Sequence, residues 1–156
     1  MVHRLKYQHA RHLAEPLAAL LGGYLDTGPV PSVEAIVPVP LHPNRLRQRG
    51  YNQSTLLARE LSARASLPVV DDCLERVRDT PAQMHLPARQ RLTNVHGAFC
   101  ARDRRLAGAT VLLVDDVCTT GATLEACADA LKRAKVRSVW GLALARARFG
   151  ANVPHP

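Results

Sequence analysis

The stretch TVLLVDDVCTTGATLEAC, residues 110–127, decides the fold. It begins with an apolar run, continues with two adjacent carboxylates, Asp115 and Asp116, and then turns to small and hydroxyl-bearing residues. A continuous apolar run is typical of a parallel strand that is covered on both faces. Two neighbouring acids are costly to bury without partners. The pattern therefore predicts a buried strand with a partner or a ligand against its polar end.

The residues that follow the two acids predict an anion-binding turn. Residues 122–135, ATLEACADALKRAK, are rich in helix formers and predict a helix. A helix N-terminus presents free backbone N–H groups to an anion, and small residues let the backbone approach a phosphate closely. The preceding carboxylates can accept hydrogen bonds from vicinal sugar hydroxyls. A ribose 5-phosphate meets both demands at once.

Outward from this unit, strands and helices alternate along the chain. Gly22-Gly23 is expected to end the first helix, and Pro16 to kink it. Asn52 or Ser54 is expected to cap the second helix, and Trp140 to lie in the core. The alternation predicts an α/β fold with a doubly wound, mostly parallel sheet, in which ligands bind at the carboxyl ends of strands. The patterns favour helices over 3–21 and 55–65, and strands over 33–40, 67–72, 96–101 and 137–146.

A basic segment, LHPNRLRQRGYNQS at residues 41–54, separates the first predicted strand from the second helix, and we expect it to be a loop. It carries Arg45, Arg47 and Arg49 and no acid. Such charges are by default a solvated basic face, and the functional alternative is binding of phosphate or nucleic acid. The net charge of +8 favours an anionic partner. His42, a lone histidine after a strand, is by default structural or solvated.

Length and composition predict one domain, residues 1–156, because 47% of the residues are apolar and can form a real core. The four cysteines include no CxxC pair, so they indicate neither a zinc ribbon nor a disulfide framework. No stretch reaches the roughly 18 apolar residues of a membrane span. Charged and polar residues also interrupt the N-terminal segment, which lacks the apolar core of a signal peptide. We therefore expect a cytoplasmic protein.

Three segments resemble known families. VLLVDDVCTTGATL, residues 111–124, closely resembles the phosphoribosyl pyrophosphate (PRPP) signature of type I phosphoribosyltransferases. Residues 37–62 and 90–99 resemble hallmark segments of the ComF family of competence-associated proteins, so the resemblance covers most of the chain from about Leu5 onward. It implies a type I phosphoribosyltransferase-like fold. ComF proteins usually begin with a cysteine-rich zinc module that this sequence lacks, so no residue here inherits a zinc role.

The resemblance also implies roles for individual residues of the signature. Asp115 and Asp116 would bind the ribose hydroxyls of PRPP. An alternative role for these two acids is to cap the following helix, and the complete signature disfavours this role. The 5′-phosphate would be bound by the residues of the turn, which are Thr119, Thr120, Gly121, Ala122 and Thr123.

Further roles implied by the resemblance concern the pyrophosphate end of the ligand. Residues Arg78 to Asn94, part of a long stretch without clean periodicity, would form the flexible loop that closes over the reaction centre in the enzymes. Mg²⁺ would bind mainly through the oxygens of PRPP, with no metal site assigned to the protein. The pyrophosphate loop would comprise Val39, Pro40, Leu41 and His42, with added charge from Arg49.

Two functions follow from the resemblance. The first is a PRPP-binding phosphoribosyltransferase-like protein, which as an enzyme would transfer a phosphoribosyl group to an unidentified nitrogen acceptor. The alternative is a non-enzymatic nucleic-acid-handling protein that acts with the DNA-uptake machinery and keeps the phosphate site. The charge of +8, the 4% of aromatic residues and the basic segment 102–105 suit backbone contacts with single-stranded DNA better than base stacking.

Overall fold

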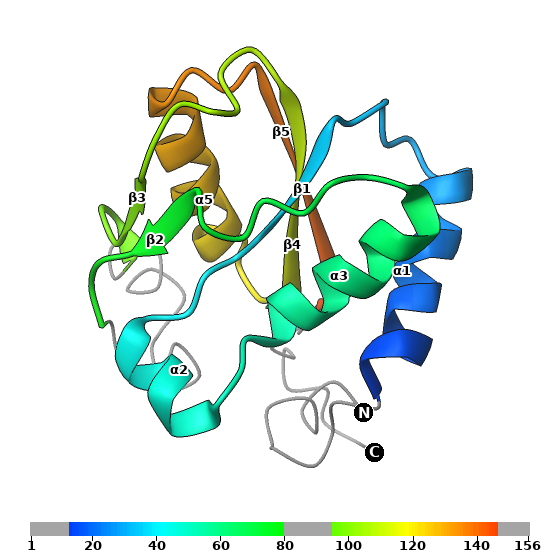
Figure 1. Ribbon diagram of the computed structural model, residues 1–156, viewed down its shortest axis with the longest axis horizontal. Coiled ribbons are helices and arrows are strands. Elements are labelled where there is room, and N and C mark those ends of the chain that lie inside the picture. The colour runs from blue at the N-terminus through cyan, green and yellow to red at the C-terminus, as the bar shows by residue number, and fades with distance from the viewer. Residues whose placement is uncertain (1–12, 80–94, 147–156) are drawn as a thin grey trace, which may run out of the picture.

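The computed structural model describes residues 13–79 and 95–146, and its centre is a sheet of three parallel strands (Figure 1). The central strand, β4 (Thr110–Cys118), has β1 (Ala35–Pro38) on one side and β5 (Ser138–Arg146) on the other. Both pairings are parallel, so the chain must cross over the sheet between them. These strands and their crossover helices confirm the predicted α/β class.

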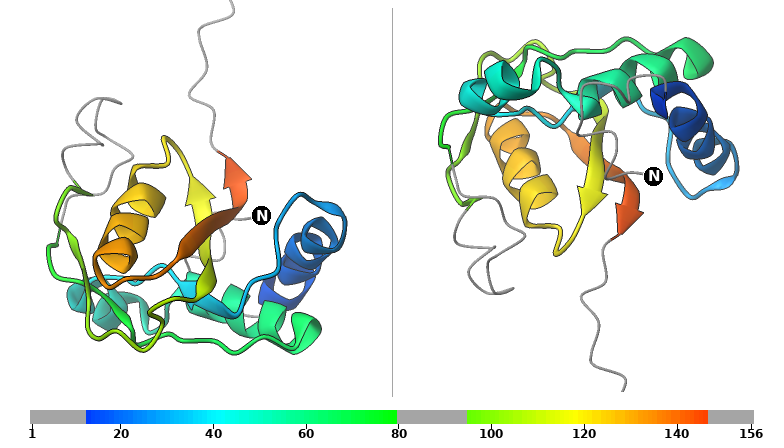
Figure 2. Two further views of the ribbon diagram at one scale, coloured as in Figure 1. Left: turned by 90° about the horizontal axis from the view of Figure 1, so that it is seen from above. Right: turned by 90° about the horizontal axis from the view of Figure 1, so that it is seen from below.

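Helices cover both faces of this sheet (Figure 2). α1 (Ala14–Thr27) and α3 (Gln53–Ala65) pack on one face, and α5 (Ala122–Arg133) packs on the other. Successive side chains of a strand point to opposite faces, so the run 111–114 supplies both cores in alternation and is fully buried. A continuous apolar run is what a strand between two helical layers needs. The doubly wound, mostly parallel sheet predicted from the sequence is therefore confirmed.

A second, two-stranded sheet lies beside α5. Its strands, β2 (Leu74–Arg76) and β3 (Phe99–Ala101), pair antiparallel. The strand predicted over 67–72 is wrong, because only Val69 there forms an isolated bridge, with Ile36. A proline and two consecutive aspartates keep that segment from extending into a ladder. The actual strand β2 begins two residues after the predicted strand ends.

The first helix ends later than its sequence pattern indicates. α1 extends to Thr27, and the predicted stop at Gly22 and Gly23 lies inside the helix. Gly22 packs against α3, where close approach offsets the low helix propensity of glycine. Pro16 lies in the first turn, where its missing N–H breaks no intrahelical bond, and not at a kink. Residues 1–12, which the prediction also covered, lie outside the described residues.

The basic segment 41–54 was expected to be a loop, but it forms a short helix, α2 (Pro43–Arg49). Its start and stop signals are local. Pro43 occupies the first helical position, the His42 side chain accepts a hydrogen bond from the Asn44 N–H at 3.3 Å, and Gly50 ends the helix with a φ of 80°. The segment lacks an apolar stripe, so periodicity alone did not indicate a helix.

The remaining differences concern boundaries and one core residue. Asn52 caps α3 by accepting a hydrogen bond from the Ser54 N–H, which confirms one of the two predicted caps. The strand predicted over 33–40 is shorter, and the strand predicted from the run 111–114 is longer. Trp140 was expected in the core, but it is 38% exposed on β5, the outer strand of the three. β5 is one of two outer strands and its faces are less covered than those of β4, so Leu142 is its only buried residue.

Candidate functional site

The pairing of β1 with β4 brings the predicted binding segments to one edge of the sheet (Figure 1). Pro38 lies opposite Val114, so residues 39–42 and the two acids leave the paired region at the same end. The Val39 N–H donates to the Val114 carbonyl oxygen at 2.9 Å. The turn 119–123 follows β4 at the same edge and leads into α5. In open parallel sheets this carboxyl edge is where ligands bind.

The two acids lie in the last part of β4, each only 8% exposed. The Ser54 hydroxyl donates to Asp115 Oδ1 at 3.1 Å, and Gln53 Nε2 donates to Asp116 Oδ2 at 3.3 Å. Asp115 Oδ1 also accepts from the Asp116 N–H at 2.9 Å. The polar groups against the acids therefore come from the first turn of α3, where Gln53 and Ser54 are themselves buried.

The environment of Asp115 opposes its ionisation. Burial raises the pKa of Asp115 to about 7, and the neighbouring Asp116 charge acts in the same direction. The hydrogen bonds from the Asp116 N–H and the Ser54 hydroxyl lower it, but to a smaller extent. Burial and the Asp115 charge also raise the pKa of the Cys127 thiol beneath. A cation or a hydroxyl-bearing ligand at these acids would relieve this electrostatic cost.

The turn after β4 has the backbone geometry that an anion site requires. Gly121 stands at the N-cap of α5 with a φ of 89°, a region that favours glycine. The Ala122 N–H donates to Thr120 Oγ1 at 3.4 Å, and among the described residues no other side chain caps the helix. The two acids lie within the strand before the turn. The alternative in which they cap the following helix is therefore wrong.

The space inside this turn is small. A cavity of about 10 Å³ is lined by residues that include Asp115, Thr119, Gly121 and Thr123. That volume accommodates about one water molecule. A phosphate group would therefore have to bind on the open side of the turn, where Thr120 is exposed, or widen it.

The residues of the predicted pyrophosphate loop differ in burial and in backbone hydrogen bonding. Val39 is buried, and its carbonyl oxygen accepts from Asn52 Nδ2 at 2.9 Å, so its backbone is engaged in the fold. The three residues after it, including His42, are partly exposed. Arg49 lies at the C-terminal end of α2, away from the first turn, which adjoins the loop.

An acid that follows β2 faces the first turn of α2. Asn44 Nδ2 donates to Asp79 Oδ2 at 3.0 Å, and Arg45 Nε lies 3.4 Å from Asp79 Oδ1. His42 Nδ1 lies 3.5 Å from Asp79 Oδ2. The hydrogen bond from Asn44 lowers the pKa of Asp79, as do the charges of His42 and Arg45. The arginine of α2 that lies against Asp79 is thus Arg45, in the first turn.

Arg76 links the two parts of the site. It is only 7% exposed, and its guanidinium lies over the Phe99 ring at 5.4 Å from the ring centre. Burial lowers the pKa of Arg76, as does the charge of Arg45, whereas Asp79 and Asp115 raise it. Its positive charge therefore acts on the basic turn of α2 on one side and on the buried acid of β4 on the other.

Sequence analysis assigned no binding role to four residues of this edge, which are Gln53, Ser54, Arg76 and Asp79; it considered Ser54 only as a helix cap and Asp79 only as part of the flexible loop. The first two follow the helix cap in the segment that resembles ComF proteins, so their position carried a signal. The other two lie on and just after β2, whose contacts with α2 and β4 join residues far apart in the chain. Of the predicted flexible loop, residues 78–94, all but the first two lie outside the described residues.

The second predicted basic segment, 102–105, differs from the arginines of α2. Arg102 Nε lies 3.0 Å from Glu75 Oε2, and Arg105 binds Asp72 at 2.9 Å. Ion pairs therefore neutralise much of the positive charge of this segment, which the sequence suggested would be available to an anionic partner.

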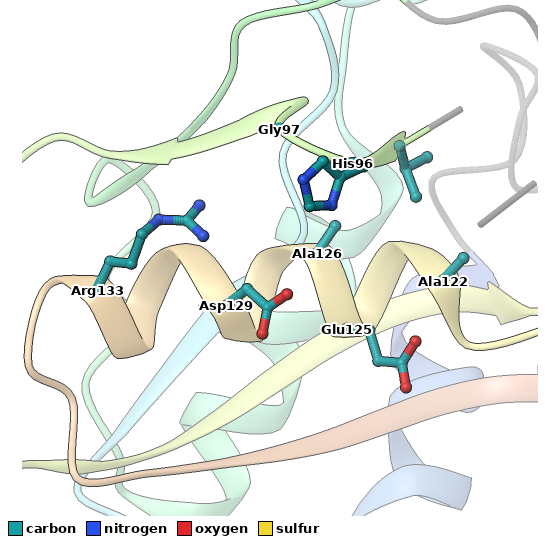
Figure 3. A pocket seen from close by; sticks show the side chains of 8 residues that line it. His96, Gly97, Ala122, Glu125, Ala126, Asp129 and Arg133 are labelled. Carbon is teal, nitrogen blue, oxygen red and sulfur yellow. The ribbon is translucent and has the colours of Figure 1, made fainter. Parts of the chain in front are cut away.

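A larger hollow of about 350 Å³ lies on the far side of α5 (Figure 3). It is bounded by the helix and by the segment that contains His96. It begins at Ala122, which belongs to the turn, but carries Glu125 and Asp129 as well as Arg133. Two carboxylates disfavour a phosphate there. The hollow is therefore not part of the anion site.

An acid pair at the end of a central parallel strand, followed by a glycine turn, is the arrangement of the phosphoribosyltransferase class. The family described as "Phosphoribosyl transferase domain" matches residues 52–150. The glutamine PRPP amidotransferase from B. subtilis, in complex with ADP and GMP, superposes with a TM-score of 0.61 at 16% identity, over 92% of this chain and 30% of that one. At this identity the likeness shows the fold alone.

Relatives with higher sequence identity show which family within this class the chain belongs to. Competence protein F of Haemophilus influenzae is 37% identical over 93% of this chain and 67% of its own length. DNA utilization protein YhgH of Salmonella typhi is 37% identical over 91% and 65%, and competence protein ComFC of Bacillus subtilis 30% identical over 71% and 44%. The chain belongs to the ComF family, as the sequence motifs predicted. It spans about two thirds of the length of the first two relatives.

In the part of the chain that the structure describes, none of the helices has the length and apolar character needed to cross a membrane.

Proposed function

We propose that the protein binds PRPP at the carboxyl edge of its parallel sheet. The observation that carries this proposal is the register of β1 with β4, because it joins the acid pair, the glycine turn and residues 39–42 at one edge. These three segments match three parts of the ligand, which are the ribose, the 5′-phosphate and the pyrophosphate. The family match is consistent with the proposal.

In this proposal each part of the edge has its own chemical task. Asp115 and Asp116 accept hydrogen bonds from the ribose hydroxyls, which are suitable donors for buried carboxylates. The turn Thr119, Thr120, Gly121, Ala122 and Thr123 receives the 5′-phosphate through backbone N–H groups, threonine hydroxyls and the positive end of α5. Val39, Pro40, Leu41 and His42, with Arg49, adjoin the pyrophosphate.

The proposal includes Mg²⁺ as an ion that binds together with PRPP. Within residues 13–79 and 95–146, no group of three or more His, Cys, Asp or Glu side chains could hold a metal ion. Two adjacent carboxylates alone suit Mg²⁺ when phosphate oxygens and water supply the remaining ligands. Asp115 and Asp116 would then hold the ion together with PRPP, and Mg²⁺ would neutralise part of the charge on the pyrophosphate.

Calorimetric titration tests the binding proposal. PRPP with Mg²⁺ should bind at one site per chain, and ribose 5-phosphate should bind more weakly because it lacks the pyrophosphate. The proposal would be contradicted if neither PRPP nor ribose 5-phosphate gave a heat of binding and the two ligands did not compete for one site. The Glu34→Gln variant is a suitable control, because it removes an exposed acid that is paired with Arg137 at the opposite end of the sheet.

Transfer of the phosphoribosyl group to a nitrogen acceptor is the activity to test at this site. As pyrophosphate leaves ribose C1, positive charge develops on the sugar, and buried carboxylates next to the ring would stabilise it. A screen of nitrogen acceptors that monitors pyrophosphate release measures turnover directly. If no acceptor gives release above the rate of spontaneous hydrolysis, the site serves binding alone.

A second function, handling of single-stranded DNA during DNA uptake, is favoured by the three arginines of α2. Arg45, Arg47 and Arg49 lie on one short helix at the edge of the proposed PRPP site. Relatives of this chain carry the names competence protein and DNA utilization protein. Backbone phosphates of a single strand could contact these arginines without sequence preference. Fluorescence anisotropy with oligonucleotides of different sequence at several salt concentrations tests this function.

We also propose that residues 1–156 form a single domain that acts in the cytoplasm with the DNA-uptake machinery as its partner. The four cysteines are all free thiols, which fits a reducing compartment. Two of them, Cys73 and Cys127, are buried in the core, where burial raises the pKa of both thiols and makes them unreactive.

A further inference from the structure

The carboxylate of Asp79 is held by groups that would equally suit a phosphate. Asn44 donates to it at 3.0 Å, Arg45 Nε lies at 3.4 Å, and His42 Nδ1 lies at 3.5 Å. All three belong to the start of α2 and the residue before it, directly after the proposed pyrophosphate loop. Asp79 follows β2 and reaches them from a different part of the chain (Figure 1). A protein carboxylate thus occupies a cluster of anion-binding side chains.

The interactions of Asp79 are of a kind that a ligand can replace. The Asp79 side chain is 40% exposed, and the Arg45 side chain is 27% exposed. Exposed charge pairs contribute little to stability, so separating them costs little. A pyrophosphate carries more negative charge than one carboxylate and offers more acceptor oxygens, so it competes well for the same donors.

The His42 side chain adds a second reason to expect exchange. Its Nδ1 atom accepts a hydrogen bond from the Asn44 N–H and caps α2, which requires that nitrogen to carry no proton. Nδ1 can attract Asp79 only when it is protonated. The two interactions of Nδ1 are therefore alternatives. When His42 is neutral, the interactions that keep Asp79 in place are those with Asn44 and Arg45.

We propose that Asp79 is an internal competitor for the pyrophosphate group, which displaces the carboxylate from Asn44 and Arg45 when PRPP binds. This inference rests on the proposed function and adds a residue that determines specificity. A ligand without a pyrophosphate, such as ribose 5-phosphate, leaves Asp79 in place. A ligand with one gains the donors that Asp79 gives up, and its affinity is reduced by the cost of that exchange.

Arg76 interacts electrostatically with both clusters. It is buried, and both Asp79 and Asp115 act on its charge. When Asp79 leaves α2, a pyrophosphate supplies negative charge in its place, so the basic cluster never stands without a counter-charge. The acids of β4 are not displaced, because their partners Gln53 and Ser54 are buried with them.

The Asp79→Asn variant tests the inference with inorganic pyrophosphate and ribose 5-phosphate as probes. The amide keeps the size of the side chain but no longer competes as an anion. Pyrophosphate should bind about three- to tenfold more tightly, the range expected for one or two exposed charge pairs. The affinity for ribose 5-phosphate should not change. Arg45→Ala in the Asp79→Asn background should abolish the gain.

A matched control separates competition from net charge. Glu34 forms an exposed ion pair with Arg137 at 2.9 Å at the amino ends of β1 and β4, so Glu34→Gln removes the same charge from a pair outside the cluster. It should leave pyrophosphate affinity unchanged. An equal gain in both variants, or no gain with Asp79→Asn, would overturn the inference. If the wild-type protein binds PRPP but Asp79→Asn has no effect, only this inference fails. If neither PRPP nor pyrophosphate binds to either protein, the proposed function fails as well.

Discussion

The carboxyl edge of the sheet holds two charged regions that differ in how they are supported. The acid pair of β4 is buried, and buried side chains of α3 donate to both members. The basic turn of α2 is partly exposed, and a partly exposed acid, Asp79, faces it. Both regions are predicted to bind the same ligand, at opposite ends.

This difference affects how strongly each region responds to change. Charges in a buried site interact through a low effective dielectric, so their effects are large and barely depend on salt. Charges on an exposed helix are screened by water and ions. We therefore expect the acid pair to control the energy of ribose binding, and α2 to tune affinity and selectivity for the more highly charged part of the ligand.

The largest effect is expected when both acids lose their charge. The double change Asp115→Asn and Asp116→Asn keeps size but removes the charged acceptors. PRPP affinity should fall by roughly 1.5–3 kcal/mol for each strong charged hydrogen bond removed. Inorganic phosphate should be affected little, or bind slightly better, because the acids repel it. Two titrations per variant, with circular dichroism as the folding control, measure this. If the double variant bound PRPP with wild-type affinity, the two acids would not be part of the PRPP site.

The next effect is a dependence of stability on pH that originates at Asp115. Its folded-state pKa of about 7 lies above the ordinary aspartate value of 3.8, so the folded protein holds this proton more strongly than the unfolded chain. The free energy of unfolding should therefore be highest below the unfolded pKa and fall as the pH rises from about 4 to 7. The total fall is on the order of 4 kcal/mol, at about 1.4 kcal/mol per pH unit.

Urea unfolding between pH 4 and pH 8 measures this fall, and the Asp115→Asn variant isolates it from other groups. The difference in stability between wild type and variant should grow in favour of the variant as the pH rises toward 7. Parallel curves for the two proteins would show that burial of Asp115 carries no such cost. Bound PRPP with Mg²⁺ should flatten the wild-type curve, because a cation at the acids favours their ionised form.

A smaller effect is expected at the turn between the two regions. A Cβ atom at Gly121 would meet no atom of the described residues within 4 Å, so a substitution there causes no crowding at Cβ. The cost comes instead from the φ of 89°, roughly 1–3 kcal/mol for a residue other than glycine. If the turn relaxes to avoid this strain, its N–H groups lose their alignment, so phosphate and PRPP should weaken together in titrations of Gly121→Val.

Gly108→Val is the matched control for Gly121→Val. Gly108 has a φ of 78°, and a Cβ there also meets no described atom within 4 Å, but it precedes β4 and lies at the opposite end of the strand. Its substitution should destabilise the protein by a similar amount without changing phosphate affinity. Equal losses of affinity in both variants would mean that the turn acts only through overall stability.

The buried region was predictable from sequence because its signals are local. The apolar run of β4, the acids after it and the small residues of the turn are contiguous, and they predicted strand, acid pair and helix in the right order. The supporting donors Gln53 and Ser54 were not predicted. Their hydrogen bonds to β4 join residues about sixty positions apart, and no periodicity reports such a long-range interaction.

The exposed region was predicted less well, for a related reason. Its charges were evident in the sequence, but α2 has no apolar stripe to indicate a helix, and β2 shows no alternation of apolar and polar residues. Asp79 therefore had no predicted neighbour. The basic segment 102–105 was overestimated, because the acids that neutralise Arg102 and Arg105 come from the segment before and within β2.

The smallest effect is expected for single-stranded DNA, where the two basic segments can be compared directly. The triple change of Arg45, Arg47 and Arg49 to Ala should weaken binding at low salt and reduce the log–log salt slope by roughly 0.7 for each DNA phosphate that is no longer neutralised. The corresponding change of the arginines in segment 102–105 should have less effect, since Arg102 and Arg105 are already in ion pairs with acids.

The slope decides this comparison, because affinity alone cannot separate the removal of arginine–phosphate pairs from a lower net charge. Both triple variants lower the charge by three, so an effect of net charge alone would reduce binding equally in the two. Direct pairing of α2 with phosphates would reduce the slope only in the first variant. Unchanged affinity and slope after the α2 substitutions would exclude this helix from DNA binding. Because the arginines of α2 adjoin the proposed pyrophosphate site, PRPP should compete with the oligonucleotide, and the Asp79→Asn variant should strengthen the binding of both.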